Sequence, residues 1–184
     1  RSVASGLPTA GSASGIPARC RLPSFPSYRT CNSVKIELRY AVDSDIAAIA
    51  ADARQADVEE ISALGRTVVE AMSSGMQLGD WSATGLIDDV PVCMFGVVPA
   101  NILAGIGVPW LITTNKVAAN EKVFLRRCRP VVDAMLRSYP RLSNIVAEKN
   151  VVAIRWLGWL GFELKSETVM VNGHEFRQFR KGDF

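Results

Sequence analysis

The stretch 150–162 constrains the fold of this chain more than any other part of the sequence. Its apolar residues recur at helical spacing, which predicts a short helix with one buried face. These residues are Ile154, Leu157 and Leu160. Asn150 opens the helix, and Gly161 follows it where a helix end needs a residue in the left-handed conformation. The strand Phe162–Lys165 comes directly after, so the sequence predicts a helix that turns at once into a strand.

Alternating and helical patterns extend this unit into an α/β domain with a mixed, twisted sheet. Strands are predicted at 35–42, 81–87, 90–98, 106–113 and 142–147, with a terminal hairpin of 164–171 and 175–180 around the Asn172-Gly173 turn. Two helices are expected between the first two strands, with a break near 55–57 and an end at Gly75 and Gly79. A long helix should open at Asn115 or Asn120, with a kink or helix start at Pro130.

The first 33 residues have a different composition from the rest of the chain. Residues 1–32 contain no Asp or Glu, are rich in Ser, Gly and Ala, and include four prolines. Such a segment cannot bury enough apolar surface to fold alone. We therefore expect an extended N-terminal arm over 1–33 and one domain over 34–184. Three interpretations of the arm stay open: an organellar transit peptide, a mis-started terminus without a role, and an arm that becomes ordered on a partner.

Composition excludes several classes of function. The formal net charge of +3 is too small to indicate sequence-specific nucleic-acid binding. No apolar run of about 18 residues is present, so no transmembrane helix is expected. The four cysteines form no CxxC pair and the chain has a single histidine, His174, so no metal site is expected. Cys93 and Cys128 are interpreted as buried thiols, and Cys20 and Cys31 as free thiols, although these two could form a bridge.

Several motifs give the chain a resemblance to known proteins. An Asn-opened helix that ends in Leu-Gly-Phe, together with the predicted order of elements, resembles the last αβ unit of the GNAT acetyltransferase fold. A narrower resemblance is to the phage family of GNAT-like proteins that includes the small internal virion protein of T7-like phages. It covers about residues 36–179. Its motifs here are Gly107-Val108-Pro109-Trp110-Leu111-Ile112-Thr113, Phe124-Leu125-Arg126-Arg127, Pro140-Arg141-Leu142-Ser143-Asn144, and Asn150 with Ile154–Leu157 and Leu160–Phe162.

The narrower resemblance implies a phage or prophage origin and a role in virion morphogenesis. The resemblance also implies that the protein is located in the virion or the host cytoplasm and that its partners are other phage structural proteins. The arm has no counterpart in that resemblance. Its candidate partner-binding residues are Phe25 and Tyr28 as apolar anchors and Arg19, Arg21 and Arg29 as cations.

The fold resemblance also implies where a coenzyme would bind. Acetyl-CoA enzymes of this fold hold the pyrophosphate in a Gly-rich loop at the start of the long helix, where backbone N–H groups meet the negative charge. The corresponding stretch here, 113–122, contains no glycine. Thr113, Thr114, Asn115 and Lys116 are the remaining candidates for anion contacts, and helix capping is the simpler interpretation of them. No cofactor is therefore expected.

The candidates for acid–base chemistry are few. Glu148 follows a predicted strand, and Asn150 matches the helix-opening Asn that can bond the pantetheine arm in active members of the fold. Capping of the helix is the simpler role for Asn150. The sequence thus favours a virion-associated interaction protein with a degenerate coenzyme site. The alternative is an acetyl-CoA-dependent N-acetyltransferase with an atypical phosphate loop.

Overall fold

The computed structural model describes residues 28–29 and 35–184. The strands in this part of the chain are β1 (Tyr28–Arg29), β2 (Lys35–Tyr40), β3 (Trp81–Ile87), β4 (Val90–Asn101), β5 (Ile106–Thr113), β6 (Arg141–Ala147), β7 (Glu163–Val171) and β8 (His174–Gly182). The α-helices are α1 (Asp43–Ala50), α2 (Gln55–Ala63), α3 (Val68–Leu78), α4 (Glu121–Ser138) and α5 (Val151–Trp159), and a 3-10 helix, η3 (Asn115–Asn120), leads into α4.

The strands form one mixed sheet with the order β1-β2-β3-β4-β5-β6-β8-β7 in the described residues. Neighbouring strands are antiparallel except β5 and β6, which are parallel. The backbone of β1 pairs with β2, Tyr28 opposite Ile36, so the sheet begins inside the predicted arm. Only the backbone of Tyr28 and Arg29 is described, and Arg19, Arg21 and Phe25 lie outside the described residues.

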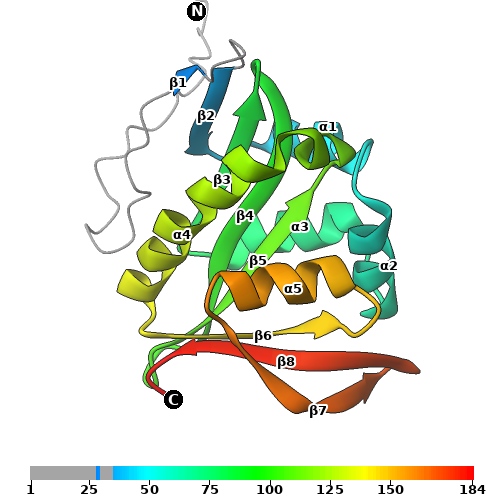
Figure 1. The fold of residues 1–184 in the computed structure, drawn as a ribbon, viewed down its shortest axis with the longest axis vertical. Helices are drawn as coiled ribbons and strands as arrows, with labels where there is room; N and C mark the ends of the chain where they lie inside the picture. Colours follow the sequence, from blue (N-terminus) through cyan, green and yellow to red (C-terminus); the bar gives the residue numbers. More distant parts are fainter. Residues whose placement is uncertain (1–27, 30–34) are drawn as a thin grey trace, which may run out of the picture.

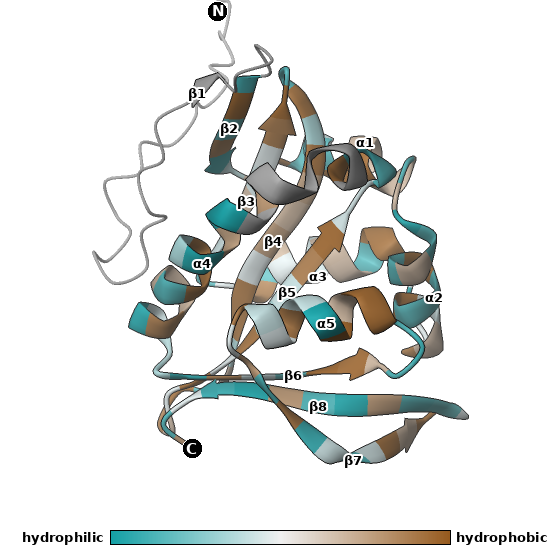
Figure 2. Ribbon diagram, in the orientation of Figure 1, coloured by the Kyte–Doolittle hydropathy of each residue, from teal (hydrophilic) through white to brown (hydrophobic). Residues whose placement is uncertain are grey.

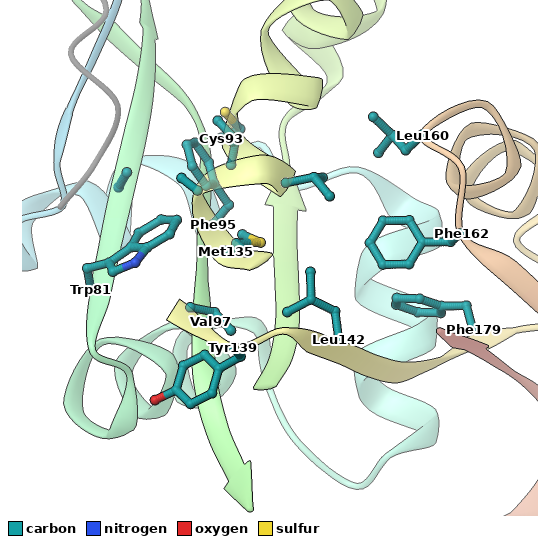
Figure 3. Packing of buried hydrophobic residues seen from close by; sticks show 14 of the residues in the cluster. Trp81, Cys93, Phe95, Val97, Met135, Tyr139, Leu142, Leu160, Phe162 and Phe179 are labelled. Carbon is teal, nitrogen blue, oxygen red and sulfur yellow. The ribbon is translucent and has the colours of Figure 1, made fainter. Parts of the chain in front are cut away.

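Helices cover both faces of the sheet, as Figure 1 shows. Alternation along β4 explains this arrangement, because successive side chains of a strand point to opposite faces. Cys93, Phe95 and Val97 join the core under α4 and α5, whereas Met94 joins the core under α1 and α3. Figure 3 shows the first core, in which Met135 of α4 and Leu160 beside α5 meet side chains of the sheet. Strand β8 is mostly hydrophilic (Figure 2), and its two apolar residues, Phe176 and Phe179, are buried.

The region between β2 and β3 differs from the prediction of two helices, because it contains three. Gly65 adopts a φ of +76° directly after α2, which ends that helix. Thr67 then starts α3 with a capping box: Glu70 N–H donates to Thr67 Oγ1, and Thr67 N–H donates to the Glu70 carboxylate. Gly75 does not end a helix as predicted. It lies inside α3 against Trp110, where a Cβ would come within 2.5 Å of the indole ring.

The predicted junction between α5 and β7 is confirmed. Asn150 caps α5 by accepting a hydrogen bond from Ala153 N–H at 3.3 Å. Gly161 has a φ of +80°, and Phe162 N–H donates to Leu157 C=O at 3.0 Å, the long bond that closes a helix of this kind. Pro130 lies within α4 rather than at its start.

This geometry predicts opposite effects for one substitution at two nearby glycines. Gly161→Ala should destabilise the domain by about 1 kcal/mol or more, because an L-residue is disfavoured at positive φ. Gly158→Ala is the control, since it lies within α5 and its Cβ would meet only Leu164 Cδ1, at 3.9 Å. It should be neutral or stabilise by up to about 1 kcal/mol, because alanine favours helix. Urea unfolding of both variants measures the difference, and equal midpoints would contradict the prediction.

Candidate functional site

The candidate site lies where β5 and β6 separate. The two parallel strands pair only through Ile106 with Arg141 and Gly107 with Leu142, after which they diverge. Diverging strands leave backbone groups on their facing edges without a ladder partner, and buried groups of this kind need hydrogen bonds from elsewhere. Helix α2 supplies two of these hydrogen bonds from carboxylates one turn apart.

The first carboxylate, Asp57, satisfies the end of β5. Its Oδ2 accepts hydrogen bonds from Thr113 N–H at 3.1 Å and from the Thr113 hydroxyl at 2.9 Å. Its Oδ1 forms an ion pair with Arg54 Nη2 at 2.5 Å. The backbone of Arg54 also donates to Thr113 C=O at 2.8 Å, so the start of α2 is fixed to the last residue of β5.

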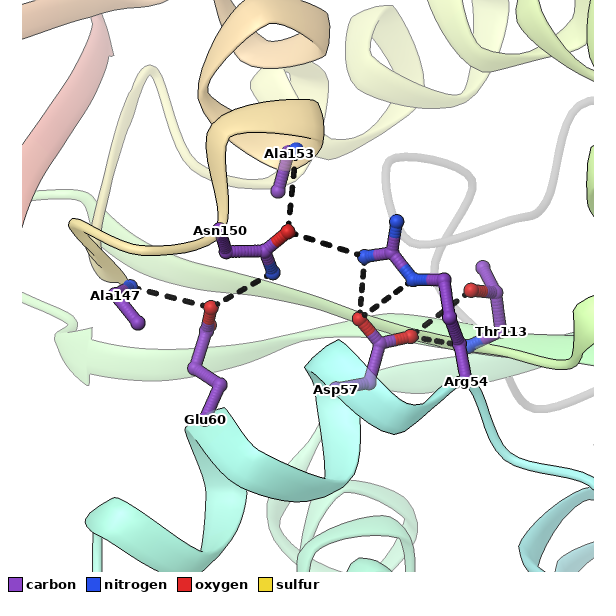
Figure 4. A network of polar contacts seen from close by, with 7 residues as sticks. All are labelled: Arg54, Asp57, Glu60, Thr113, Ala147, Asn150 and Ala153. Atoms are coloured by element: carbon purple, nitrogen blue, oxygen red, sulfur yellow. Dashed lines mark hydrogen bonds and ion pairs between the residues drawn. The ribbon is translucent and has the colours of Figure 1, made fainter.

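The second carboxylate, Glu60, satisfies the end of β6. Its Oε2 accepts from Ala147 N–H at 3.1 Å and from Asn150 Nδ2 at 3.0 Å. Arg54 Nη2 lies 3.5 Å from Asn150 Oδ1, which links the two halves into one network (Figure 4). The network therefore connects α2, the ends of both diverging strands and the N-terminus of α5.

Burial changes the acidity of Glu60. It raises the pKa of the Glu60 carboxyl above its ordinary value of 4.5, while the hydrogen bonds from Asn150 and Ala147 act in the opposite direction. A carboxyl with a raised pKa beside a cavity is the kind of group that is found at functional sites.

A cavity of about 970 Å³ adjoins this network. It has walls on both sides of the sheet, with Phe124 of α4 and Trp156 of α5 on one side and Ile61 of α2 on the other. Three buried donors in its lining have no hydrogen-bond partner in the described residues: Trp110 Nε1, Thr114 Oγ1 and Trp156 Nε1. The arrangement is an apolar cavity with a few polar groups at the divergence of the strands, which is typical of a small-molecule site.

The last residue of β5, the residue after it and the first residue of η3 have their backbone donors engaged within the protein. Thr113 N–H donates to Asp57, Thr114 N–H donates to Val92 C=O at 2.8 Å, and Asn115 N–H donates to Asp52 C=O at 3.2 Å. The Asp52 carboxylate also accepts from Asn115 Nδ2 at 3.3 Å. Three successive backbone donors are thus engaged within the protein, and a carboxylate stands beside the third.

The structure brings together most of the predicted site residues but not all. Thr113, Thr114, Asn115 and Asn150 line the cavity, whereas Lys116 is exposed and is not among the lining residues. The structure places Glu148, the sequence candidate for an acid–base group, outside the lining of the cavity. Glu148 forms a bidentate ion pair with Arg177 on β8, at 2.6 and 2.9 Å, and does not join the network around Asn150.

Sequence reasoning missed the residues that organise the site, which are Arg54, Asp57 and Glu60. They are spaced three apart, so they share one face of α2. Ile61, which packs against the core, lies on the same helix. The signal available in the sequence was the three-residue spacing of these charged residues next to a residue that packs against the core.

Two kinds of site find no support in the described residues. No group of three His, Cys, Asp or Glu side chains there could hold a metal ion. Among the helices of residues 35–184, none has the length and apolar character needed to cross a membrane.

Comparisons with known proteins address the fold. No family model and no curated protein matches the sequence. Solved structures do match. A spermidine N-acetyltransferase mutant from Vibrio cholerae has a TM-score of 0.60 at 10% identity, covering 80% of this chain and 93% of that chain. An uncharacterized protein from Bacillus halodurans has a TM-score of 0.63 at 10% identity, covering 86% and 89%. A putative acetyltransferase from Salmonella typhimurium, solved with acetyl-CoA, has a TM-score of 0.58 at 12% identity, covering 80% and 93%.

This chain has the GNAT fold. The predicted fold class is therefore confirmed, including the mixed sheet between two helical layers. Identities this low establish the fold alone, because one fold can carry many functions.

The raised pKa of Glu60 predicts a pH-dependent effect of Glu60→Gln. The folded state binds the Glu60 proton more tightly than the unfolded state, so this residue favours folding below pH 4.5 and loses that contribution as the pH rises through the raised pKa. Glutamine keeps an acceptor oxygen but cannot ionise. The stability of Glu60→Gln relative to the wild type should therefore increase from about pH 4 to about pH 7.

Urea midpoints of both proteins at the two pH values provide the measurement. Glu59→Gln, at the neighbouring exposed position, is the matched control and should show no such increase. A constant difference between Glu60→Gln and the wild type across this range would contradict the prediction.

Proposed function

We propose that this chain is a phage virion-associated or morphogenesis protein, which uses a GNAT-like fold with a degenerate coenzyme site for protein–protein interaction. The observation that supports the loss of the coenzyme site is the engagement of the Thr113, Thr114 and Asn115 amides by acceptors of the protein itself. An incoming pyrophosphate would have to replace these hydrogen bonds.

Charge and sterics oppose an anion at the same place. The Asp52 carboxylate contacts Asn115 and lies beside the position of the expected phosphates, whereas the charge of Asp57 is offset by its ion pair with Arg54. Like charges at such distances repel, and the repulsion is larger where water is excluded. The stretch 113–122 also lacks the glycines that let a backbone approach a phosphate closely.

The phage role rests on the motif resemblance across about residues 36–179. In this proposal the protein is located in the virion or the host cytoplasm, and its partners are other phage structural proteins. The acid-free arm is the segment proposed to contact them, because such a segment can bind in an extended form along a neighbouring surface.

Isothermal titration with acetyl-CoA tests the degenerate site. We expect no saturable binding at micromolar concentrations, because the amides and charges described above oppose the pyrophosphate. The Salmonella acetyltransferase that was solved with acetyl-CoA is the positive control. Saturable low-micromolar binding with one site per chain would contradict the proposal.

A second candidate is an acetyl-CoA-dependent N-acetyltransferase with an atypical phosphate loop. One observation favours it: Glu60, with its raised pKa, lies in the lining of a cavity of about 970 Å³ beside Asn150. In this proposal Glu60 removes the proton of the attacking amine, because a carboxylate with a raised pKa is a stronger base than an ordinary one. Acetyl transfer by the wild type that falls at least about 100-fold in Glu60→Gln would establish this candidate.

Deletion of residues 1–27 tests the role of the arm. The deletion keeps Tyr28 and Arg29, whose backbone pairs with β2. We expect the melting temperature of the domain to change little, while incorporation into phage particles is lost. The full chain, expressed at the same level, is the control for incorporation. Incorporation of the shortened protein at the normal copy number would show that the arm is dispensable.

A further inference from the structure

The two helical layers on opposite faces of the sheet carry opposite charge. Residues 43–80, which contain α1, α2 and α3, include eight acidic and two basic residues. Residues 115–160, which contain α4 and α5, include nine basic and three acidic residues. Because the sheet separates the two layers (Figure 1), the domain presents an acidic side and a basic side.

The acidic layer keeps its charge at the surface. Asp43, Glu59 and Glu70 are exposed, one on each of the three helices. Of its two basic residues, Arg54 is paired with the buried Asp57, and Arg66 is the one exposed cation among the described residues of this layer. We call the exposed surface of α1–α3 the acidic layer.

The basic layer displays its cations outward as well. The exposed cations are Arg126, Arg129 and Arg137 on α4, Lys149 before α5, and Arg155 on α5. Asp133 is the exposed acidic residue among the described side chains of α4 and α5. We call the exposed surface of α4 and α5 the basic layer.

Apolar side chains are exposed within both layers. On α5, Val151, Val152 and Trp159 are 55%, 62% and 43% exposed, and their helical spacing places them on one outer face around Arg155. Figure 2 shows hydrophobic residues in the first turn of this helix. In the acidic layer Val42, Val69 and Leu78 are exposed in the same way. Exposed apolar groups framed by charge are typical of an interaction surface.

We propose that the basic layer of one copy of this chain binds the acidic layer of a second copy. The charges of the two layers are complementary, and each layer brings apolar side chains that the contact would remove from water. A symmetric contact between identical layers would place like charges against each other, so the contact is head-to-tail. Head-to-tail contacts repeat, and they produce rings or open filaments.

A second copy fits these surfaces better than a nucleic acid does. A nucleic acid would satisfy the cations but would leave Val151 and Val152 against a charged backbone, and it would not explain the acidic layer. A second copy accounts for both layers at once. Val152, Arg155 and Trp159 also line the cavity, but the contact uses none of the side chains of the Asp57–Glu60 network.

Sedimentation velocity of the full chain tests the proposal. The mean mass should rise with protein concentration in about 0.1 M salt and fall to that of a monomer in about 1 M salt, because the screening length shortens from about 10 Å to about 3 Å. A protein that stays monomeric at low salt up to the highest concentration measured would overturn the proposal.

Charge reversals identify the surfaces. Arg126→Glu with Arg155→Glu in the basic layer, and Asp43→Lys with Glu59→Lys in the acidic layer, should each abolish association of the chain with itself. Glu167→Lys with Glu175→Lys on the exposed β7–β8 hairpin is the matched control for charge and should associate like the wild type.

An equimolar mixture of the two reversed proteins decides the geometry. Each has one intact layer, and the two reversed layers are complementary to each other, so association should return in the mixture although each protein alone stays monomeric. A mixture that remains monomeric overturns the head-to-tail contact. Normal association of the basic-layer variant also overturns it, because the acidic layer would then be binding another cationic segment such as the N-terminal arm.

Discussion

The rest of the site depends on the divergence of β5 and β6 after two residue pairs. A buried backbone N–H without a partner costs about 1–3 kcal/mol, so the two strand ends need acceptors from outside the sheet. Asp57 and Glu60 provide them at Thr113 and Ala147. Because both carboxylates belong to α2, one helix turn holds the two strands at a fixed separation, and the cavity persists between them.

The same hydrogen bonds limit the chemistry of the site. The Thr113 amide donates to the Asp57 carboxylate and the Asn115 amide donates to the Asp52 carbonyl, so neither is free to donate to a phosphate, and the nearby Asp52 carboxylate repels the phosphate charge. Glu60 is constrained less, because both of its hydrogen bonds reach a single oxygen, Oε2. Hydrogen bonds within the protein therefore constrain the part of the site where a phosphate would bind more than the part at Glu60, which faces the cavity.

The features that were predicted from the sequence are local ones. Asn150 and Gly161 act on their own helix, and the alternation along β4 indicates which side chains lie on each face of one strand. Each of these features can be recognised within a few residues of sequence. The network is not local. Asp57 meets Thr113 across 56 positions, and Glu60 meets Asn150 across 90. No regular spacing of residues in the sequence predicts contacts between partners so far apart in the chain. Glu148 was chosen because it is close to Asn150 in the chain, but the pairing of β6 with β8 turns it toward Arg177 instead.

The charges of the two layers have different physical origins. Beneath the acidic layer, Asp45, Asp57 and Glu60 point inward from α1 and α2 and serve the fold: Asp45 accepts from Arg39 and Thr84, and the other two complete the diverging strands. Part of the acidity of residues 43–80 is therefore imposed by the sheet. The exposed cations Arg126, Arg137 and Arg155 meet no such internal requirement, because they face solvent on helices whose opposite sides form the core. A charge that the fold does not need is best explained by something outside the molecule, and the acidic layer of another copy supplies the complementary surface.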